Sequence, residues 1–273
     1  MDLSQALQIV SRSHAGMVRS HNEDAIYVNA ACGLAILADG MGGYNAGEVA
    51  AGMATTLLGS ELEKCFQRTP PHKPDASGKL YARAAVAAEI ARTNAAIYQA
   101  AQSQPQYAGM GTTLVMAVFY DNSMTVAHIG DSRLYRLRGD DFRQITKDHS
   151  LLQEQIDSGL ITPAEARRSR NKGLVTRALG VDPVVEPEIR DYDTQPGDIY
   201  LLCSDGLNDM VEDQEIGLTL RTLSGNLELA ADRLVQTAND NGGRDNVSVI
   251  LVRIACEYPA ARGWLARLSA WLN

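Results

Sequence analysis

Apolar and polar positions are grouped along the chain in a way that separates expected strands from expected helices. Short, mostly apolar runs bounded by turn-forming residues predict strands at residues 6–13, 25–29, 34–38, 112–120, 124–129, 133–137, 142–145, 184–189, 198–203 and 247–254. Longer stretches predict helices at residues 46–66, 80–101, 212–223 and 227–240, and a polar helical segment at 148–170 that Pro163 should break.

Tight turns indicate how the strands pair. The pairs Asp121-Asn122, Gly130-Asp131 and Gly139-Asp140 each separate two closely spaced strand runs, which is typical of hairpins and therefore of antiparallel pairing. Strand runs and helix runs are segregated, and this order favours an α+β fold with antiparallel sheets and helices on the outer faces. We find no internal repeat and no interdomain linker.

The stretch from Leu34 to Gly47 is the most informative part of the chain. A buried strand is expected to end at Asp39, and glycines follow at positions 40, 42 and 43. A carboxylate and an exposed glycine carbonyl are both oxygen ligands that suit a hard cation. Taken alone, the ordinary alternative is an Asp-Gly turn between a strand and a helix.

Further carboxylates occupy the same kind of position, at the end of an apolar strand and next to glycine or asparagine. They are Asp39, Asp131, Asp205, Asp245 and the pair Glu23-Asp24. Strands of one sheet end on common edges, so several of these groups should converge, and clustered carboxylates ionise together only when a cation neutralises them. Oxygen ligands without His or Cys favour Mg²⁺, Mn²⁺ or Ca²⁺ over zinc. The alternative is a general excess of acidic loops.

Composition narrows the class of protein. The net charge of −8 argues against non-specific nucleic-acid binding, which needs a basic surface. There is no apolar run long enough for a membrane span, and the N-terminal residues lack the features of a signal peptide. The four cysteines, at positions 32, 65, 203 and 256, form no CxxC pair, so we expect reduced thiols and a cytoplasmic protein.

Eight motifs, in order between residues 12 and 254, resemble those of the bacterial PPM-type (type 2C) metal-dependent serine/threonine protein phosphatases. They are Arg19-x-x-Asn22-Glu23-Asp24, Ala38-Asp39-Gly40-Met41-Gly42-Gly43 with Gly47-Glu48, Gly109-Met110-Gly111-Thr112-Thr113, His128-Ile129-Gly130-Asp131-Ser132-Arg133, Thr146-Lys147-Asp148-His149-Ser150, Thr176-Arg177-Ala178-Leu179-Gly180, Ser204-Asp205-Gly206-Leu207 and Gly242-Gly243-Arg244-Asp245-Asn246. The resemblance implies a four-layer α-β-β-α sandwich and a catalytic domain at residues 1–256.

The resemblance also implies a role for individual residues. Asp39 should bridge two metal ions, with the Gly40 carbonyl on one of them and with Asp205 and Asp245 on the other. Glu23 and Asp24 should hold metal-bound waters, and Asp131 should help to bind a weaker third metal. Arg19 should bind the substrate phosphate, and Asn246 and Tyr44 should lie beside the site. Many bacterial relatives have His where this chain has Tyr44, a poorer general acid at pH 7.

The implied activity is hydrolysis of phosphoserine and phosphothreonine in proteins, with two Mn²⁺ or Mg²⁺ ions activating a bridging hydroxide for in-line attack on phosphorus. The substrates would be phosphorylated proteins, including a bacterial serine/threonine kinase or its targets. One alternative is a non-catalytic module of the same fold that binds phosphoproteins in signalling. A two-metal nuclease is a further alternative, against which the acidic charge argues.

Three features remain open at this level. The segment 148–172 resembles the family's flap, and its basic residues could steer phosphopeptides or simply face solvent. Residues 257–273 lie outside the motifs and are expected to form an amphipathic helix with Trp264 and Trp271 on one face. That helix would pack on the domain, or dock a partner or a membrane surface. His128 and His149 receive no chemical role, and a structural role is favoured for His128.

Overall fold

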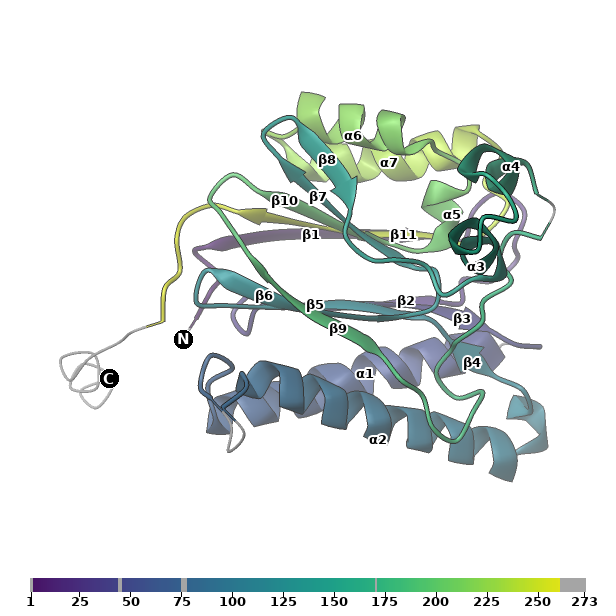
Figure 1. Cartoon of the computed structure of the whole chain (residues 1–273), viewed down its shortest axis with the longest axis horizontal. Helices are drawn as coiled ribbons and strands as arrows, with labels where there is room; N and C mark the ends of the chain where they lie inside the picture. Colours follow the sequence, from purple (N-terminus) through teal and green to yellow (C-terminus); the bar gives the residue numbers. More distant parts are fainter. Residues whose placement is uncertain (1, 44–45, 75–77, 170, 261–273) are drawn as a thin grey trace.

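The computed structural model describes residues 2–43, 46–74, 78–169 and 171–260. Within these residues the strands form two antiparallel sheets that pack face to face (Figure 1). The first sheet has the order β2-β3-β5-β6-β9, with β4 paired to β3, and the second has the order β1-β11-β10-β7-β8. The first sheet comprises β2 (Asp24–Asn29), β3 (Leu34–Met41), β4 (Gly111–Thr112), β5 (Leu114–Tyr120), β6 (Ser123–Ile129) and β9 (Glu188–Asp193). The second comprises β1 (Leu7–His14), β7 (Arg133–Arg138), β8 (Asp141–Gln144), β10 (Ile199–Cys203) and β11 (Val247–Ile254).

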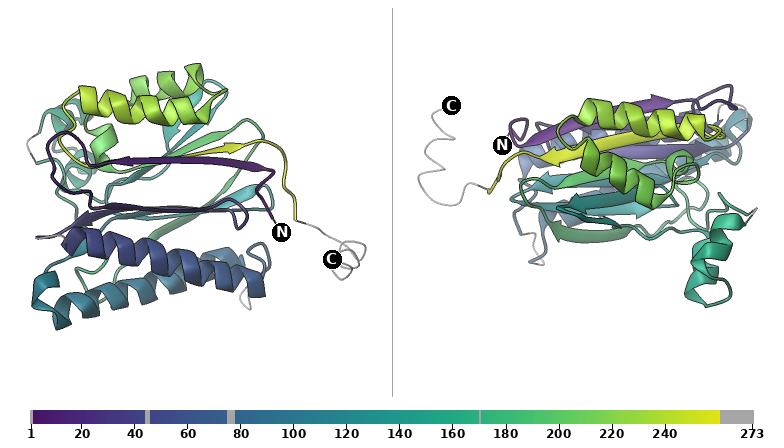
Figure 2. Two further views of the ribbon diagram at one scale, coloured as in Figure 1. Left: turned by 180° about the vertical axis from the view of Figure 1, so that it is seen from behind. Right: turned by 90° about the horizontal axis from the view of Figure 1, so that it is seen from above.

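Helices cover both outer faces, so the molecule has the expected four layers. Helices α1 (Ala46–Arg68) and α2 (Tyr81–Ser103) lie on the first sheet, and α6 (Asp213–Thr222) and α7 (Leu227–Asp240) lie on the second (Figures 1 and 2). One apolar core lies between α1, α2 and the first sheet, a second between the sheets, and a third between the second sheet and α6 and α7. Successive side chains of a strand point to opposite faces of its sheet, and both faces are covered by another layer. Both sets of side chains therefore lie in an apolar core, which explains the nearly continuous apolar runs in the sequence.

Most predicted elements are present, and the differences have local causes. Strand β3 does not end at Asp39 but continues to Met41, because Asp39 pairs with Asp24 and the next two residues pair with β4. The strand expected at 184–189 begins only at Glu188. Pro163 starts a helix instead of breaking one, because it occupies the first turn of α4 (Pro163–Arg168) behind a capping box from Thr162 and Glu165.

The short segments between the layers matter for the site. Helix α3 (Leu151–Asp157) and α4 form the segment resembling a flap, at one end of the sheets (Figure 1). Helix α5 (Asp205–Asn208), which the sequence pattern did not reveal, follows β10 directly, and the short 3₁₀ helix η1 (Pro105–Tyr107) follows α2. None of the helices in the described residues has the length and apolar character that a membrane span needs.

The described C-terminal residues are anchored to the β5–β6 hairpin. Asp121 and Asn122 have positive φ angles of 48° and 55°, as a tight two-residue turn requires. Their side chains accept hydrogen bonds from the backbone N–H groups of Ala260 and Tyr258, at 2.8 Å and 2.6 Å. Nearly all of the expected C-terminal helix, including Trp264 and Trp271, lies outside the described residues, so its packing stays a prediction.

Candidate metal and phosphate site

Carboxylates from both sheets meet at the end of the sandwich next to the flap. Asp24 and Asp39 are direct partners across β2 and β3, Asp205 begins α5 after β10, and Asp245 precedes β11. Asp39, Asp205 and Asp245 line a cavity of about 510 Å³, and Asp24 is the neighbour of Asp39 across the strand pair without lining the cavity itself. Its lining comprises Arg19, Ser20, His21, Glu23, Asp39, Gly40, Met41, Gly42, Thr113, Asp131, Lys172, Gly173, Val175, Asp205, Asp209, Asp245 and Asn246. Most of the residues expected from the sequence therefore lie together.

Asp24 carries the clearest sign that the site suits a cation. Its Oδ2 accepts a hydrogen bond from the Ser204 hydroxyl at 2.8 Å, whereas its Oδ1 is buried and has no hydrogen-bond partner among the described residues. Burial raises the pKa of Asp24 to about 6. Since a buried carboxylate oxygen without a partner is unfavourable, this atom is suited to a cation or to a water held by one.

The neighbouring carboxylates show the same effect. Burial and the charges of Asp24 and Asp205 raise the pKa of Asp39 well above its usual value. Burial, followed by the charge of Asp131, does the same for the pKa of Asp205, and burial followed by Asp148 raises the pKa of Asp131 to about 6. These groups resist ionising together in the absence of a cation. The donors are all oxygen atoms, so they fit Mg²⁺ or Mn²⁺.

Gly40 is required by close packing against Gly47 and Glu23 beside the cavity. A Cβ at this position would lie 2.1 Å from the Gly47 carbonyl oxygen and 2.7 Å from the Glu23 carbonyl oxygen. A Cβ at Gly47 would in turn lie 2.7 Å from Oε2 of Glu23. Glu23 is thus fixed between two glycines beside the cavity, and burial raises its pKa. The glycines at positions 40 and 47 are therefore needed for close packing around Glu23, and not only to form a turn.

Asn246 fixes the loop that carries Arg19 and Glu23. Its Oδ1 accepts a hydrogen bond from the Glu23 backbone N–H at 2.7 Å, and its Nδ2 donates to the carbonyls of Ala15 at 3.0 Å and His21 at 2.8 Å. The side chain is 5% exposed, so solvent contributes little to these groups. Asn246 therefore acts on the site by positioning other residues.

Arg19 lies at the rim of the cavity. Its Nη2 donates to Oδ2 of Asp245 at 2.8 Å, and this hydrogen bond raises the pKa of the guanidinium. The side chain remains 57% exposed. An exposed guanidinium beside the carboxylates can receive a phosphate from solvent with two parallel N–H donors.

One charged residue at the site escaped the sequence analysis. Asp209 lines the cavity and lies 3.3 Å from Nζ of Lys172, which belongs to the flap segment. The spacing of four residues between Asp205 and Asp209, in a helical turn closed by a hydrogen bond of 2.8 Å, was the signal that could have revealed it. Tyr44, expected beside the site, lies outside the described residues.

The flap is joined to the sandwich by a partly buried ion pair. Arg133 contacts both carboxylate oxygens of Asp148, with its Nη2 donating at 2.7 Å and its Nε at 3.0 Å and 3.1 Å. Of the basic flap residues, Arg167 pairs with Glu212 and Lys172 with Asp209. These pairs reduce the free positive charge that could steer a substrate, and they hold the flap against Asp209 and Glu212.

Comparison with known proteins agrees with this geometry. The family model described as protein phosphatase 2C matches residues 12–251. The chain belongs to the protein phosphatase 2C family. It is 39% identical over 248 residues to the serine/threonine protein phosphatase PstP of Mycobacterium tuberculosis, covering 91% of this chain and 45% of that protein. It therefore spans about half the length of this relative.

Shorter relatives and solved structures match over nearly their whole length. The serine/threonine phosphatase stp of Listeria innocua is 37% identical over 259 residues, covering 88% of this chain and 93% of that protein. A crystal structure of the M. tuberculosis PstP/Ppp phosphatase superposes with a TM-score of 0.80 at 38% identity, covering 91% of this chain and 99% of that one. A structure of the PstP catalytic domain in complex with two manganese ions superposes with a TM-score of 0.78 at 38% identity, covering 91% and 98%.

Proposed function

We propose that this protein is a metal-dependent phosphatase that hydrolyses phosphoserine and phosphothreonine in proteins. The observation that carries the proposal is the convergence of Asp24, Asp39, Asp205 and Asp245 beside an exposed arginine. Burial raises the pKa values of Asp24, Asp39 and Asp205, and clustered carboxylates of this kind attract divalent cations, so a phosphate then needs only a further cationic contact. The names of the relatives and the two manganese ions of the PstP complex support the same reading.

The chain offers a specific set of metal ligands. Asp39 and the Gly40 carbonyl would hold one ion, Asp39, Asp205 and Asp245 would hold a second, and Glu23 and Asp24 would accept hydrogen bonds from metal-bound waters. Asp131 would contribute to a third, weaker site. When bound, the ions supply Lewis-acid stabilisation of the phosphoryl group and lower the pKa of a water molecule. We infer Mn²⁺ or Mg²⁺ from the oxygen donors.

The protein's own groups bind and orient the substrate. The guanidinium of Arg19 donates to Asp245 in this structure, and it would be free to bind two phosphate oxygens if Asp245 held a metal ion. Asn246 keeps Arg19 and Glu23 on the same side of the cavity. Lys172 and Gly173 place the flap against the residues that flank the phosphorylated side chain.

The substrate class follows from the open site. A cavity lined by the exposed Arg19 and a surface flap admits a phosphorylated segment of a folded protein better than it selects a small metabolite. Phosphoproteins made by a bacterial serine/threonine kinase, including the kinase itself, fit this description. The four cysteines at 32, 65, 203 and 256 are unpaired, which supports a reducing compartment such as the cytoplasm.

Release of phosphate from a phosphothreonine peptide tests the proposal. We would assay the purified protein with Mn²⁺, with Mg²⁺ and with EDTA, and compare the Asp205→Ala variant with an Asp240→Asn control on the exposed end of α7. Turnover that requires metal and disappears in Asp205→Ala alone is the expected result. Peptide binding without phosphate release would refute the enzyme and favour the non-catalytic phosphoprotein-binding module.

A further inference from the structure

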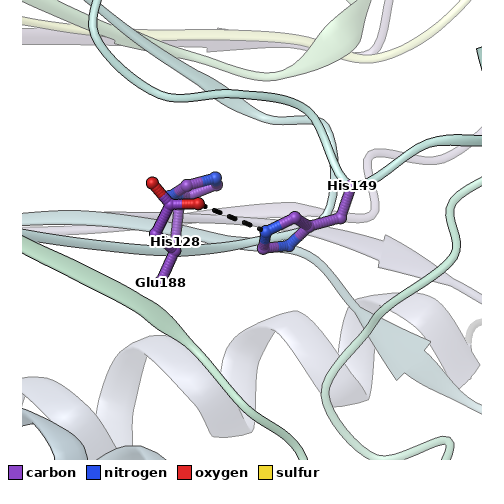
Figure 3. A group of neighbouring side chains, drawn as sticks. All are labelled: His128, His149 and Glu188. Carbon is purple, nitrogen blue, oxygen red and sulfur yellow. Dashed lines mark ion pairs between the residues drawn. The ribbon is translucent and has the colours of Figure 1, made fainter. Parts of the chain in front are cut away.

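His128, His149 and Glu188 form a cluster that the proposed phosphatase site does not use (Figure 3). His128 on β6 and Glu188 on β9 are direct cross-strand partners, so their side chains leave the same face of the sheet. His149 comes from the loop between β8 and α3, and its ring stacks on that of His128 at a centroid distance of 4.6 Å. Three segments that are distant in the sequence thus bring two imidazoles and one carboxylate together.

The spacing of these groups suits a single metal ion. One ligand atom of each residue lies within 4.8 Å of the others. A point equidistant from three such atoms is at most about 2.8 Å from each, whereas zinc binds nitrogen at about 2.0–2.1 Å, so the atom separations must shorten by less than about 1 Å, in addition to a change in ring orientation. Two histidines with one glutamate are an established zinc ligand set, in contrast to the oxygen-only donors of the carboxylate cavity.

Both rings are neutral, as ligation needs, and His149 must shift its proton from Nε2 to Nδ1 to bind the ion, because its Nδ1 accepts a hydrogen bond from the Gly130 N–H. Burial lowers the pKa of His128, and burial together with His128 lowers the pKa of His149 to about 4, so both imidazoles are neutral at pH 7. The Nε2 of His128 donates to the Lys147 carbonyl at 2.8 Å, because a carbonyl can only accept. This bond leaves the lone pair on Nδ1, and a backbone carbonyl of this kind commonly orients metal-binding histidines.

We propose that His128, His149 and Glu188 bind one Zn²⁺ ion at a site separate from the carboxylate centre. Nε2 of His149 lies 3.9 Å from Oε2 of Glu188, so these two atoms face each other across the site. The stacked rings, 18° apart, must splay so that their lone pairs converge on the ion. The sequence favoured a purely structural role for His128. Its position beside His149 and Glu188 adds a role in metal binding.

Zinc binding at this site would change the hydrogen bonding of the backbone next to Asp131 in the carboxylate centre. Nδ1 of His149 accepts a hydrogen bond from the Gly130 N–H at 3.3 Å. A neutral His149 that ligates through Nε2 carries its proton on Nδ1 and can no longer accept this bond. Gly130 directly precedes Asp131, and the His149 N–H also donates to the Gly130 carbonyl at 2.9 Å. Occupation of the zinc site therefore alters the backbone that positions Asp131.

Cobalt spectroscopy separates the two sites. In saturating Mg²⁺, which fills the carboxylate centre, we would titrate the protein with Co²⁺ and then displace it with Zn²⁺. A four-coordinate site with nitrogen ligands gives intense visible absorption, whereas six oxygen ligands give weak absorption. We expect one Co²⁺ per chain with the intense spectrum, and its loss on addition of one equivalent of Zn²⁺.

Matched variants decide the assignment. Glu188→Gln keeps the shape of a half-buried residue on the edge strand β9, and Glu186→Gln is the control at an exposed position two residues away. Glu188→Gln should weaken Co²⁺ binding at least about tenfold, and Glu186→Gln should leave it unchanged. A His149→Asn variant provides an independent loss of one ligand. If the wild-type protein lacks the intense spectrum, or if neither ligand variant weakens it, the zinc site is overturned, whatever the result of the phosphatase assay.

Discussion

Replacing Asn246 by alanine should lower both stability and activity, although its side chain is not expected to touch substrate. The change removes three hydrogen bonds, from the Glu23 N–H and to the carbonyls of Ala15 and His21. A typical buried hydrogen bond contributes about 1 kcal/mol net, so the free energy of unfolding should fall by about 3 kcal/mol. For a domain of this size that loss lowers Tm by about 6–12 °C.

The functional effect should appear in substrate binding more than in turnover. Residues 15–23 carry Arg19, and without Asn246 this loop is no longer held against the start of β11. We therefore expect KM for a phosphothreonine peptide to rise more than kcat falls, measured with saturating Mn²⁺.

Asn241→Ala is the matched control, since the Asn241 side chain donates a single hydrogen bond, to the Met210 carbonyl at 2.9 Å, at an exposed position. Its Tm should fall by no more than about 4 °C, in line with one hydrogen bond. If Asn246→Ala melts within 2 °C of the wild-type protein, or if its kinetic constants match those of Asn241→Ala, the positioning role of Asn246 is wrong.

Three further changes probe the same end of the sandwich. Gly40→Ala should abolish Mn²⁺-dependent activity and lower Tm in thermal melts, because its Cβ would lie 2.1 Å from the Gly47 carbonyl oxygen; a variant with wild-type Tm and activity would contradict this packing. Arg133→Ala should reduce the free energy of unfolding by about 3 kcal/mol in urea titrations, because the 9% exposed Asp148 loses its charged partner and keeps only the Gln144 side-chain amide. In EDTA, stability should be greatest near pH 4 and fall as pH rises through about 6, because the folded state raises the pKa values of Asp24 and Asp131 and so binds their protons more tightly than the unfolded chain. Mn²⁺ should therefore increase Tm more at pH 7 than at pH 5, and an increase that is equal at both values would count against these shifts.

Local patterns were sufficient to predict most of the layers. The helix at residues 227–240 and the strand at 247–254 were predicted with the bounds that α7 and β11 have, because their apolar periods are set by neighbouring residues. The start of β9 and the end of β3 were missed for the opposite reason. Their limits depend on the strands beside them, His128 facing Glu188 and β4 facing Gly40 and Met41.

The same division holds for the candidate site. The motifs around Asp39, Asp205 and Asp245 predicted the carboxylates that we propose as metal ligands, since the residue types and the adjacent glycines are visible in the sequence. The roles of Asn246 and Asp209 and the grouping of His128 with His149 and Glu188 were not visible. Each depends on a contact between segments that are distant in the chain.

The sequence by itself determined which residues carry the chemistry and which stretches become strands or helices, because both depend on residue type and short-range spacing. Only the tertiary structure decided which carboxylates share one cavity and how far each is buried. It did so through strand register, which sets Asp24 against Asp39. A shift of one residue in that pairing would send one carboxylate to the opposite face of the sheet, and its pKa and its suitability as a ligand would change with it.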